Sequence, residues 1–98
     1  MAVDLVLSAG AWMLHLSDVV DVGEAGLLHA AAREAVRESP STVVVDCTAL
    51  DSLDAAATQV LLALQRSLTV GGGVLRLERV PPHIVELWRQ AGLHQLLG

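Results

Sequence analysis

Three aspartates that lie close together in the sequence are the residues best suited to acid–base chemistry. Asp46, Asp51 and Asp54 lie between a β-branched run and an alanine-rich segment. Paired carboxylates that share a site can act as general acid and general base. The same side chains are also favoured in turns and at helix N-caps, where they accept hydrogen bonds from backbone N–H groups. We favour this structural interpretation, in which Asp46 ends a strand, Asp51 lies in a turn and Asp54 caps a helix. We therefore predict that the protein is not an enzyme, with carboxylate catalysis as the less favoured alternative.

Other reactive groups are dispersed along the chain. The histidines are His15, His29, His83 and His94, and Cys47 is the single cysteine. Metal sites need grouped ligands at characteristic spacings, so we expect no metal site. Gly71 to Gly73 follows a predicted helix and precedes a predicted strand. Phosphate-binding glycine loops have the opposite order, with the strand first, so these glycines predict a turn. We therefore expect no cofactor, and we expect Cys47 to behave as a small buried hydrophobic residue.

Composition excludes several classes of partner. The chain has 98 residues and a net charge of −5, with 11 acidic and 6 scattered basic residues, which argues against nucleic acid binding. Hydrophobic residues make up 53%, but no apolar run approaches the about 20 residues of a membrane span, so we expect no membrane insertion. Asp4 precedes the first apolar run and no basic region precedes it, so a secretory signal is not expected. A cytoplasmic location is the expectation that follows, and an unpaired cysteine agrees with it.

Hydrophobic periodicity and turn residues predict strands that alternate with helices after an initial hairpin. The predicted strands are Val3–Leu7, Trp12–Leu16, Thr42–Cys47 and Val74–Leu77. The predicted helices are Glu24–Arg37, Ala55–Leu68 and a third from Pro81-Pro82 to Gly92, with one more turn in LHQLL. Strands in this order indicate an α/β sheet with crossover connections, formed by a single domain over residues 1–98.

The segment from Val43 to Leu97 resembles the C-terminal two-thirds of a STAS domain, the fold of bacterial anti-sigma factor antagonists. The matching landmarks are Asp46, Asp54, Val60-Leu61-Leu62, Gly72-Gly73 and Gly92-Leu93. The N-terminal part is similar to the family more loosely, with Ser17 where glycine is usual and Asp21 at the family's aspartate. The resemblance implies a mixed sheet of four or five strands with helices packed mainly on one face.

The resemblance also implies where a partner binds. In many STAS proteins the serine after the turn's aspartate is phosphorylated by a partner kinase, and here that position is Ala55, which has no hydroxyl group. Ser52 and Thr58 are possible displaced acceptors, although a turn and a helix-backbone hydrogen bond explain them equally. The expected partner-binding residues are Asp18, Asp21, Ser52, Asp54, Ala55, Ala56, Thr58 and Gln59.

Two kinds of partner follow from the resemblance. The first is an anti-sigma or histidine-kinase-like ATPase, or a component of a stressosome or chemotaxis-type signalling array, bound by a module with no phosphorylation switch at Ala55. The glutamine at position 59 is similar to that of STAS proteins in chemotaxis-type signalling. The second is the ATPase of a phospholipid-transport ABC complex, which the domain would brace as a small cytoplasmic subunit.

Overall fold

The computed structural model describes residues 3–8, 11–37 and 42–97. Along the chain the elements are β1 (Val3–Ser8), β2 (Ala11–Val20), α1 (Val22–Arg37), β3 (Thr42–Leu53), α2 (Ala55–Val70), β4 (Val74–Glu78), α3 (Pro82–Gln90) and the short 3-10 helix η1 (His94–Leu97). This order confirms the predicted alternation of strands and helices, including the last turn near the C-terminus.

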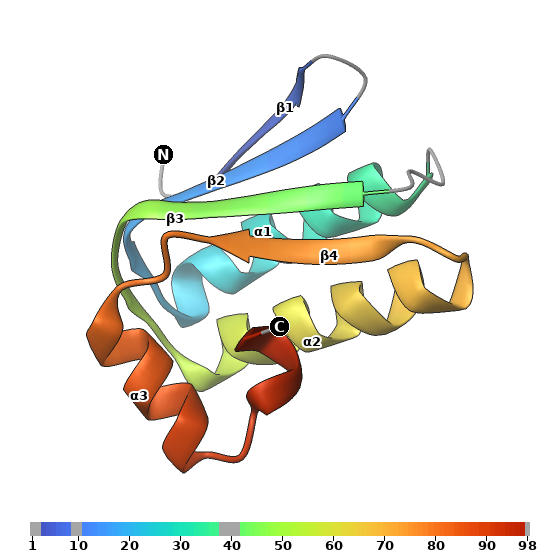
Figure 1. The fold of residues 1–98 in the computed structure, drawn as a ribbon. Helices are drawn as coiled ribbons and strands as arrows, with labels where there is room; N and C mark the ends of the chain where they lie inside the picture. Colours follow the sequence, from blue (N-terminus) through green and yellow to red (C-terminus); the bar gives the residue numbers. More distant parts are fainter. Residues whose placement is uncertain (1–2, 9–10, 38–41, 98) are drawn as a thin grey trace.

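The strands form one four-stranded mixed sheet in the order β1-β2-β3-β4. β1 pairs with β2 as an antiparallel hairpin, whereas β2, β3 and β4 are parallel to one another. Figure 1 shows α1 and α2 lying side by side beneath the sheet, with α3 at one end of the layer. The predicted α/β fold with helices on one face is therefore confirmed.

The core lies between the sheet and the helices, and β3 contributes to it along its length. Val43, Val45 and Cys47 alternate along β3 and are fully buried, as expected for a central strand whose inner face is covered by helices. From the helix layer, Leu28 of α1 and Leu61 of α2 meet this face with no exposed surface. Burial of large aliphatic side chains is the main stabilising contribution in a domain of this size.

β2 and β3 both extend beyond their predicted ends. Their backbones stay paired from Ser17 opposite Ala49 to Val20 opposite Leu53, with one irregularity in the register just before Ser17 and another after Asp18. The polar residues there have low strand propensity, but pairing between distant segments overrides that preference. Asp46 therefore does not end its strand, and Asp51 lies within β3, so both of these predictions were wrong.

Removing buried volume from α2 tests this assignment of the core. We expect Leu61→Ala to lower the free energy of unfolding by about 2–5 kcal/mol, because it deletes fully buried methyl groups and leaves a cavity. Leu87→Ala is the matched control, since Leu87 also lies in a helix but is 53% exposed. Urea denaturation followed by circular dichroism measures both values, and equal losses would contradict the proposed core.

Candidate functional site

The parallel pairing of β2 and β3 brings two helix starts to the same edge of the sheet. β2 leads into α1 at Asp21, and β3 leads into α2 at Asp54. The backbone N–H of Asp54 donates to the carbonyl oxygen of Val20 at 3.1 Å, which ties the two connections together. Residues far apart in the sequence therefore share one surface.

The start of α2 is a capped helix end with small side chains. Asp54 has extended backbone angles, and its Oδ1 accepts a hydrogen bond from the N–H of Ala57 at 2.9 Å, which confirms the predicted cap. Ala55 and Ala56 are exposed, whereas Ala57 is fully buried. The first turn of α2 thus presents two methyl groups and backbone to the solvent.

Asp21 begins α1 in a similar way. Its Oδ1 accepts from the backbone N–H groups of Gly23 at 2.9 Å and Glu24 at 3.3 Å, which satisfies donors that a helix start leaves unpaired. Asp18 lies near the end of β2 with a φ of 56°, in the left-handed region, where the pairing with β3 is irregular. Both carboxylates are on exposed residues.

The two candidate phosphoacceptors have different environments. Ser52 is exposed near the end of β3. Thr58 is only 6% exposed, and its hydroxyl donates to the backbone oxygen of Asp54 at 2.8 Å, which is the helix-backbone bond considered as its structural explanation. Thr58 is therefore less accessible than the other predicted partner-binding residues, although it lines a groove with Asp54, Ala55 and Gln59. We call the rest the helix-start surface: Asp18, Asp21, Ser52, Asp54, Ala55, Ala56 and Gln59.

Residues that the sequence analysis did not identify extend this surface. Val19 is 46% exposed next to Asp18. A groove of about 350 Å³ lies between the first turn of α2 and the C-terminal end of α3, and the exposed Leu87 and the buried Trp88 line it with Asp54 and Ala55. The approach of α3 to α2 is a tertiary contact that no local pattern shows. The sequence signal that could have indicated this groove is the apolar Leu87 directly before Trp88, because the two neighbouring residues of a helix cannot both face the core.

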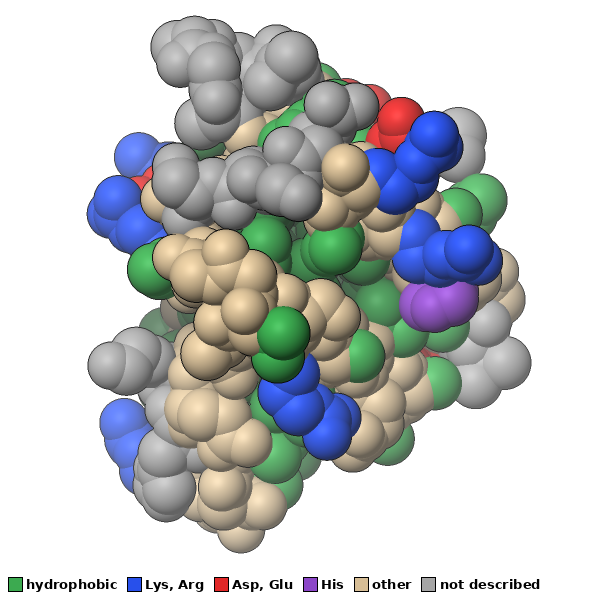
Figure 2. Space-filling view, turned by 90° about the vertical axis from the view of Figure 1, so that its right-hand side faces the viewer, with side chains coloured by type: hydrophobic (Ala, Val, Ile, Leu, Met, Phe, Trp, Pro, Cys, Tyr) green, Lys and Arg blue, Asp and Glu red, His purple; other side chains and the backbone are tan. Residues whose placement is uncertain are grey.

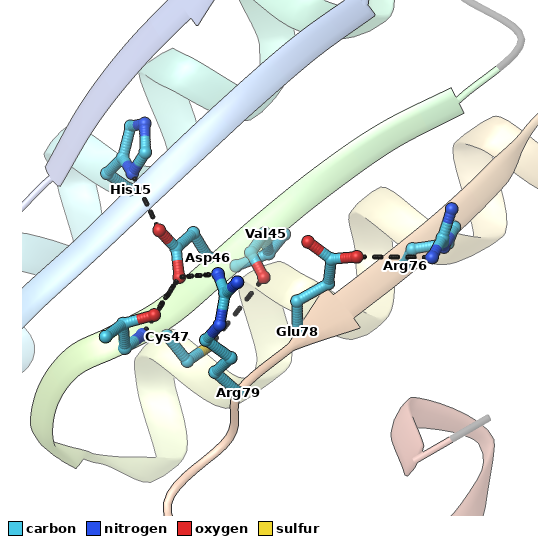
Figure 3. Close-up of polar contacts among 8 residues, drawn as sticks. His15, Val45, Asp46, Cys47, Arg76, Glu78 and Arg79 are labelled. Carbon is cyan, nitrogen blue, oxygen red and sulfur yellow. Dashed lines mark hydrogen bonds and ion pairs between the residues drawn. The ribbon is translucent and has the colours of Figure 1, made fainter.

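Asp46 belongs to a separate polar cluster, shown in Figure 3. Its Oδ2 lies 3.2 Å from Nδ1 of His15 on β2, and its Oδ1 lies 4.0 Å from the guanidinium of Arg79. The backbone N–H of Thr48 donates to Oδ1 at 3.0 Å, and the Thr48 hydroxyl donates to the same oxygen. These hydrogen bonds, more than the contact with His15, lower the pKa of Asp46 below its ordinary value of 3.8.

The described residues give no support for a reactive centre. Among residues 3–8, 11–37 and 42–97, no group of three or more His, Cys, Asp or Glu side chains is placed to hold a metal ion. Cys47 is fully buried, and burial raises the pKa of its thiol to about 12, so the nucleophilic thiolate is disfavoured at neutral pH. No helix in the described part of the chain is long and apolar enough to span a bilayer.

Comparison with known families identifies the fold. The family model described as "Mlab, STAS domain" matches residues 3–98. The chain therefore belongs to the STAS family, and STAS domains are interaction modules. No curated protein matches the chain.

Solved structures have the same fold at low sequence identity. The phosphorylated cell fate determinant SpoIIAA of Bacillus matches with a TM-score of 0.78 and 18% identity, over 97% of this chain and 87% of its own. An anti-sigma factor antagonist from Mycobacterium paratuberculosis gives 0.79 and 21%, over 95% and 79%. A sulfate transporter family protein from Wolinella succinogenes gives 0.77 and 20%, over 95% and 75%. The chain also matches Mglu, with 24% identity and a TM-score of 0.68 over 82% of this chain, but it spans only 21% of the Mglu chain.

The hydrogen bonds at Asp46 predict a pH dependence of stability. Since folding lowers its pKa, Asp46 stabilises the protein above about pH 3.8, and this contribution is lost as the pH falls through the lowered pKa. We expect Thr48→Ala to raise the pKa of Asp46 more than His15→Ala does, because the hydrogen bond from the Thr48 hydroxyl is the largest cause of the lowered pKa and the substitution removes it. Carboxyl carbon chemical shifts in an NMR titration measure both, and a larger effect of His15→Ala would contradict the assignment.

Proposed function

We propose that this STAS domain is a cytoplasmic protein-interaction module in bacterial signalling that binds its partner through the helix-start surface. The partner would be an anti-sigma or histidine-kinase-like ATPase or a component of a chemotaxis-type signalling array. The observation that carries this proposal is the exposed first turn of α2, where Asp54 caps a helix whose next two residues are solvent-accessible alanines. No reaction is part of the proposal.

The chemistry of the surface suggests how a partner is recognised. Ala55 and Ala56 allow another backbone to approach α2 closely, because their side chains end at the first carbon. Asp18, Asp21 and Asp54 add negative charge at the same edge of the sheet. A basic partner surface complements that charge, and such complementarity mainly increases association rate and specificity. The exposed side chains of Val19 and Leu87 add apolar contact area at its edges.

One structural relative carries a phosphate. SpoIIAA has been solved in phosphorylated and unphosphorylated forms, so a relative with this fold accepts a phosphate. A phosphate adds about −1.5 to −2 charges, enough to disrupt a contact that already carries carboxylates. Because Ala55 has no hydroxyl group, we propose that the module has lost this switch. Ser52 is the more accessible of the two displaced candidates, since Thr58 is buried.

A second candidate is a structural role in a transporter. The domain would brace the ATPase of a phospholipid-transport ABC complex as a small cytoplasmic subunit, again through the helix-start surface. The observation that favours it is the structural likeness to a sulfate transporter family protein, which shows that this fold also occurs in that kind of protein. The absence of a phosphorylatable hydroxyl group at Ala55 agrees equally with a bracing role, because a permanent contact needs no covalent switch.

Substitution at the first turn of α2 tests the docking surface. We expect Ala56→Arg to reduce recovery of the partner at least about 10-fold in affinity capture, because a long charged side chain blocks close approach. Ala30→Arg is the matched control, as Ala30 is also an exposed helical alanine but lies on α1.

Mass spectrometry of the captured protein then decides which class of partner the domain binds. A soluble kinase or array protein supports signalling, a transporter ATPase with its permease supports bracing, and equal capture by Ala56→Arg overturns the surface.

Incubation with the captured kinase and ATP tests the loss of the switch. We expect no phosphorylated species from the wild-type protein in phosphate-affinity electrophoresis. Ala55→Ser, which restores a hydroxyl group after the Asp54 cap, is expected to gain one and to bind the partner less tightly once modified. A wild-type species that disappears in Ser52→Ala or Thr58→Ala would show that an acceptor has been displaced and that the unswitched interpretation is wrong.

A further inference from the structure

A second surface lies between the outer sides of α1 and α2. It is a groove of about 270 Å³, separate from the helix-start surface and sharing no residue with it. Its lining comes from the later turns of α1 and the middle of α2. The lining residues are His29, Ala32, Arg33, Val36, Arg37, Val60, Ala63, Leu64 and Ser67.

The floor of this groove is apolar and recessed. Ala32 and Leu64 are buried, at 6% and 3% exposed, and the partly buried Val36 and Val60 pack against the same cluster. Ala63 is exposed on the α2 side, and its small side chain leaves the groove open there. Concave apolar surface between two helices is the shape that an additional helix fills by packing its own ridge into the groove.

The α1 side of the groove is basic. His29, Arg33 and Arg37 follow one another at intervals of four residues, so they form a row along one helix face that is about 12 Å long. None of the described residues that line the groove is acidic, although the chain has 11 acidic and only 6 basic residues. In the view of Figure 2, basic side chains and a histidine lie next to apolar side chains at the right of the molecule.

The basic row is only partly neutralised within the chain. Arg37 forms an exposed ion pair with Glu34 at 3.2 Å, and such a pair contributes little and exchanges readily. Arg33 forms no ion pair with any of the described residues. A row of exposed guanidinium groups beside an apolar floor is therefore available to carboxylates from outside the chain.

We propose that the α1–α2 groove binds an acidic amphipathic helix of a partner protein. The apolar face of that helix fills the groove above Ala32 and Leu64, and its aspartates or glutamates face Arg33 and Arg37. A protein helix fits better than an anionic membrane, because the apolar side chains are recessed below the rim and cannot enter a flat bilayer first. This contact is additional to the one at the helix-start surface, so the domain could join two protein segments.

A synthetic peptide provides the probe for this proposal. The peptide has about 18 residues, long enough to populate a helix, with Leu and Ala on one face and Glu on the other. A peptide with Lys in place of every Glu is the charge control. We expect the acidic peptide to bind the full chain in fluorescence anisotropy, with NMR shift changes at α1 and α2, and we expect at least about 10-fold weaker binding of the Lys peptide.

Substitutions of residues that line the groove test whether the acidic peptide binds there. We expect Arg33→Glu/Arg37→Glu to weaken binding of the acidic peptide at least about 10-fold by reversing the charge of the row. Arg89→Glu is the matched control, because Arg89 forms an equivalent exposed i,i+3 pair with Glu86 at 3.1 Å on α3. Ala63→Gln is expected to weaken binding without a change of charge, by filling the groove with a residue that still favours a helix.

Several outcomes would overturn the proposal. They are no binding of the acidic peptide, equal weakening by Arg89→Glu, unchanged binding by Ala63→Gln, or shift changes away from α1 and α2. Binding that depends on Arg33 and Arg37 but occurs only with phosphatidylglycerol-containing vesicles would assign the row to a membrane instead. Ala56→Arg must leave peptide binding unchanged, so that failure of the groove and failure of the helix-start surface are distinguished.

Discussion

The fold and its candidate site depend on the parallel pairing of β2 with β3 along their full length. Parallel strands end at the same edge of the sheet, so the chain must begin α1 and α2 beside each other. The hydrogen bond from the N–H of Asp54 to the oxygen of Val20 closes this pairing at its last position. If β2 and β3 ended where their hydrophobic runs end, Asp21 and Asp54 would cap helices on longer, independent connections.

The sequence predicted the elements whose signals are local. Hydrophobic periodicity gave the helices and the order of strands, and the preference of aspartate for N–H groups placed the cap at Asp54. It failed at the ends of β2 and β3, because Ser17, Asp18 and Ser52 are poor strand residues. Pairing with the backbone of the neighbouring strand holds them in place. A residue at a φ of 56°, such as Asp18, is also stable only where the surrounding structure enforces it.

Some side-chain environments can also be predicted from local signals, whereas others depend on contacts between distant segments. The exposure of Ala55, Ala56 and Gln59 and the burial of Ala57 and Thr58 follow from helical periodicity once Leu61 and Leu62 are assigned to the core. The groove beside α3 and the contact between His15 and Asp46 are different, because each joins segments that are distant in sequence. Only the register of the strands places that histidine beside that aspartate, so no spacing rule predicts it.

The two proposed docking surfaces carry charges of opposite sign. The helix-start surface carries aspartates, whereas the α1–α2 groove carries His29, Arg33 and Arg37, and α2 contributes to both. A net charge of −5 repels an acidic segment at long range, but that repulsion is screened beyond about 8 Å at physiological ionic strength. Within that distance, attraction by the guanidinium groups and burial of apolar surface against the groove floor outweigh the repulsion. The groove therefore depends on short-range contacts, and the long-range field of the chain favours a basic partner surface at the helix starts.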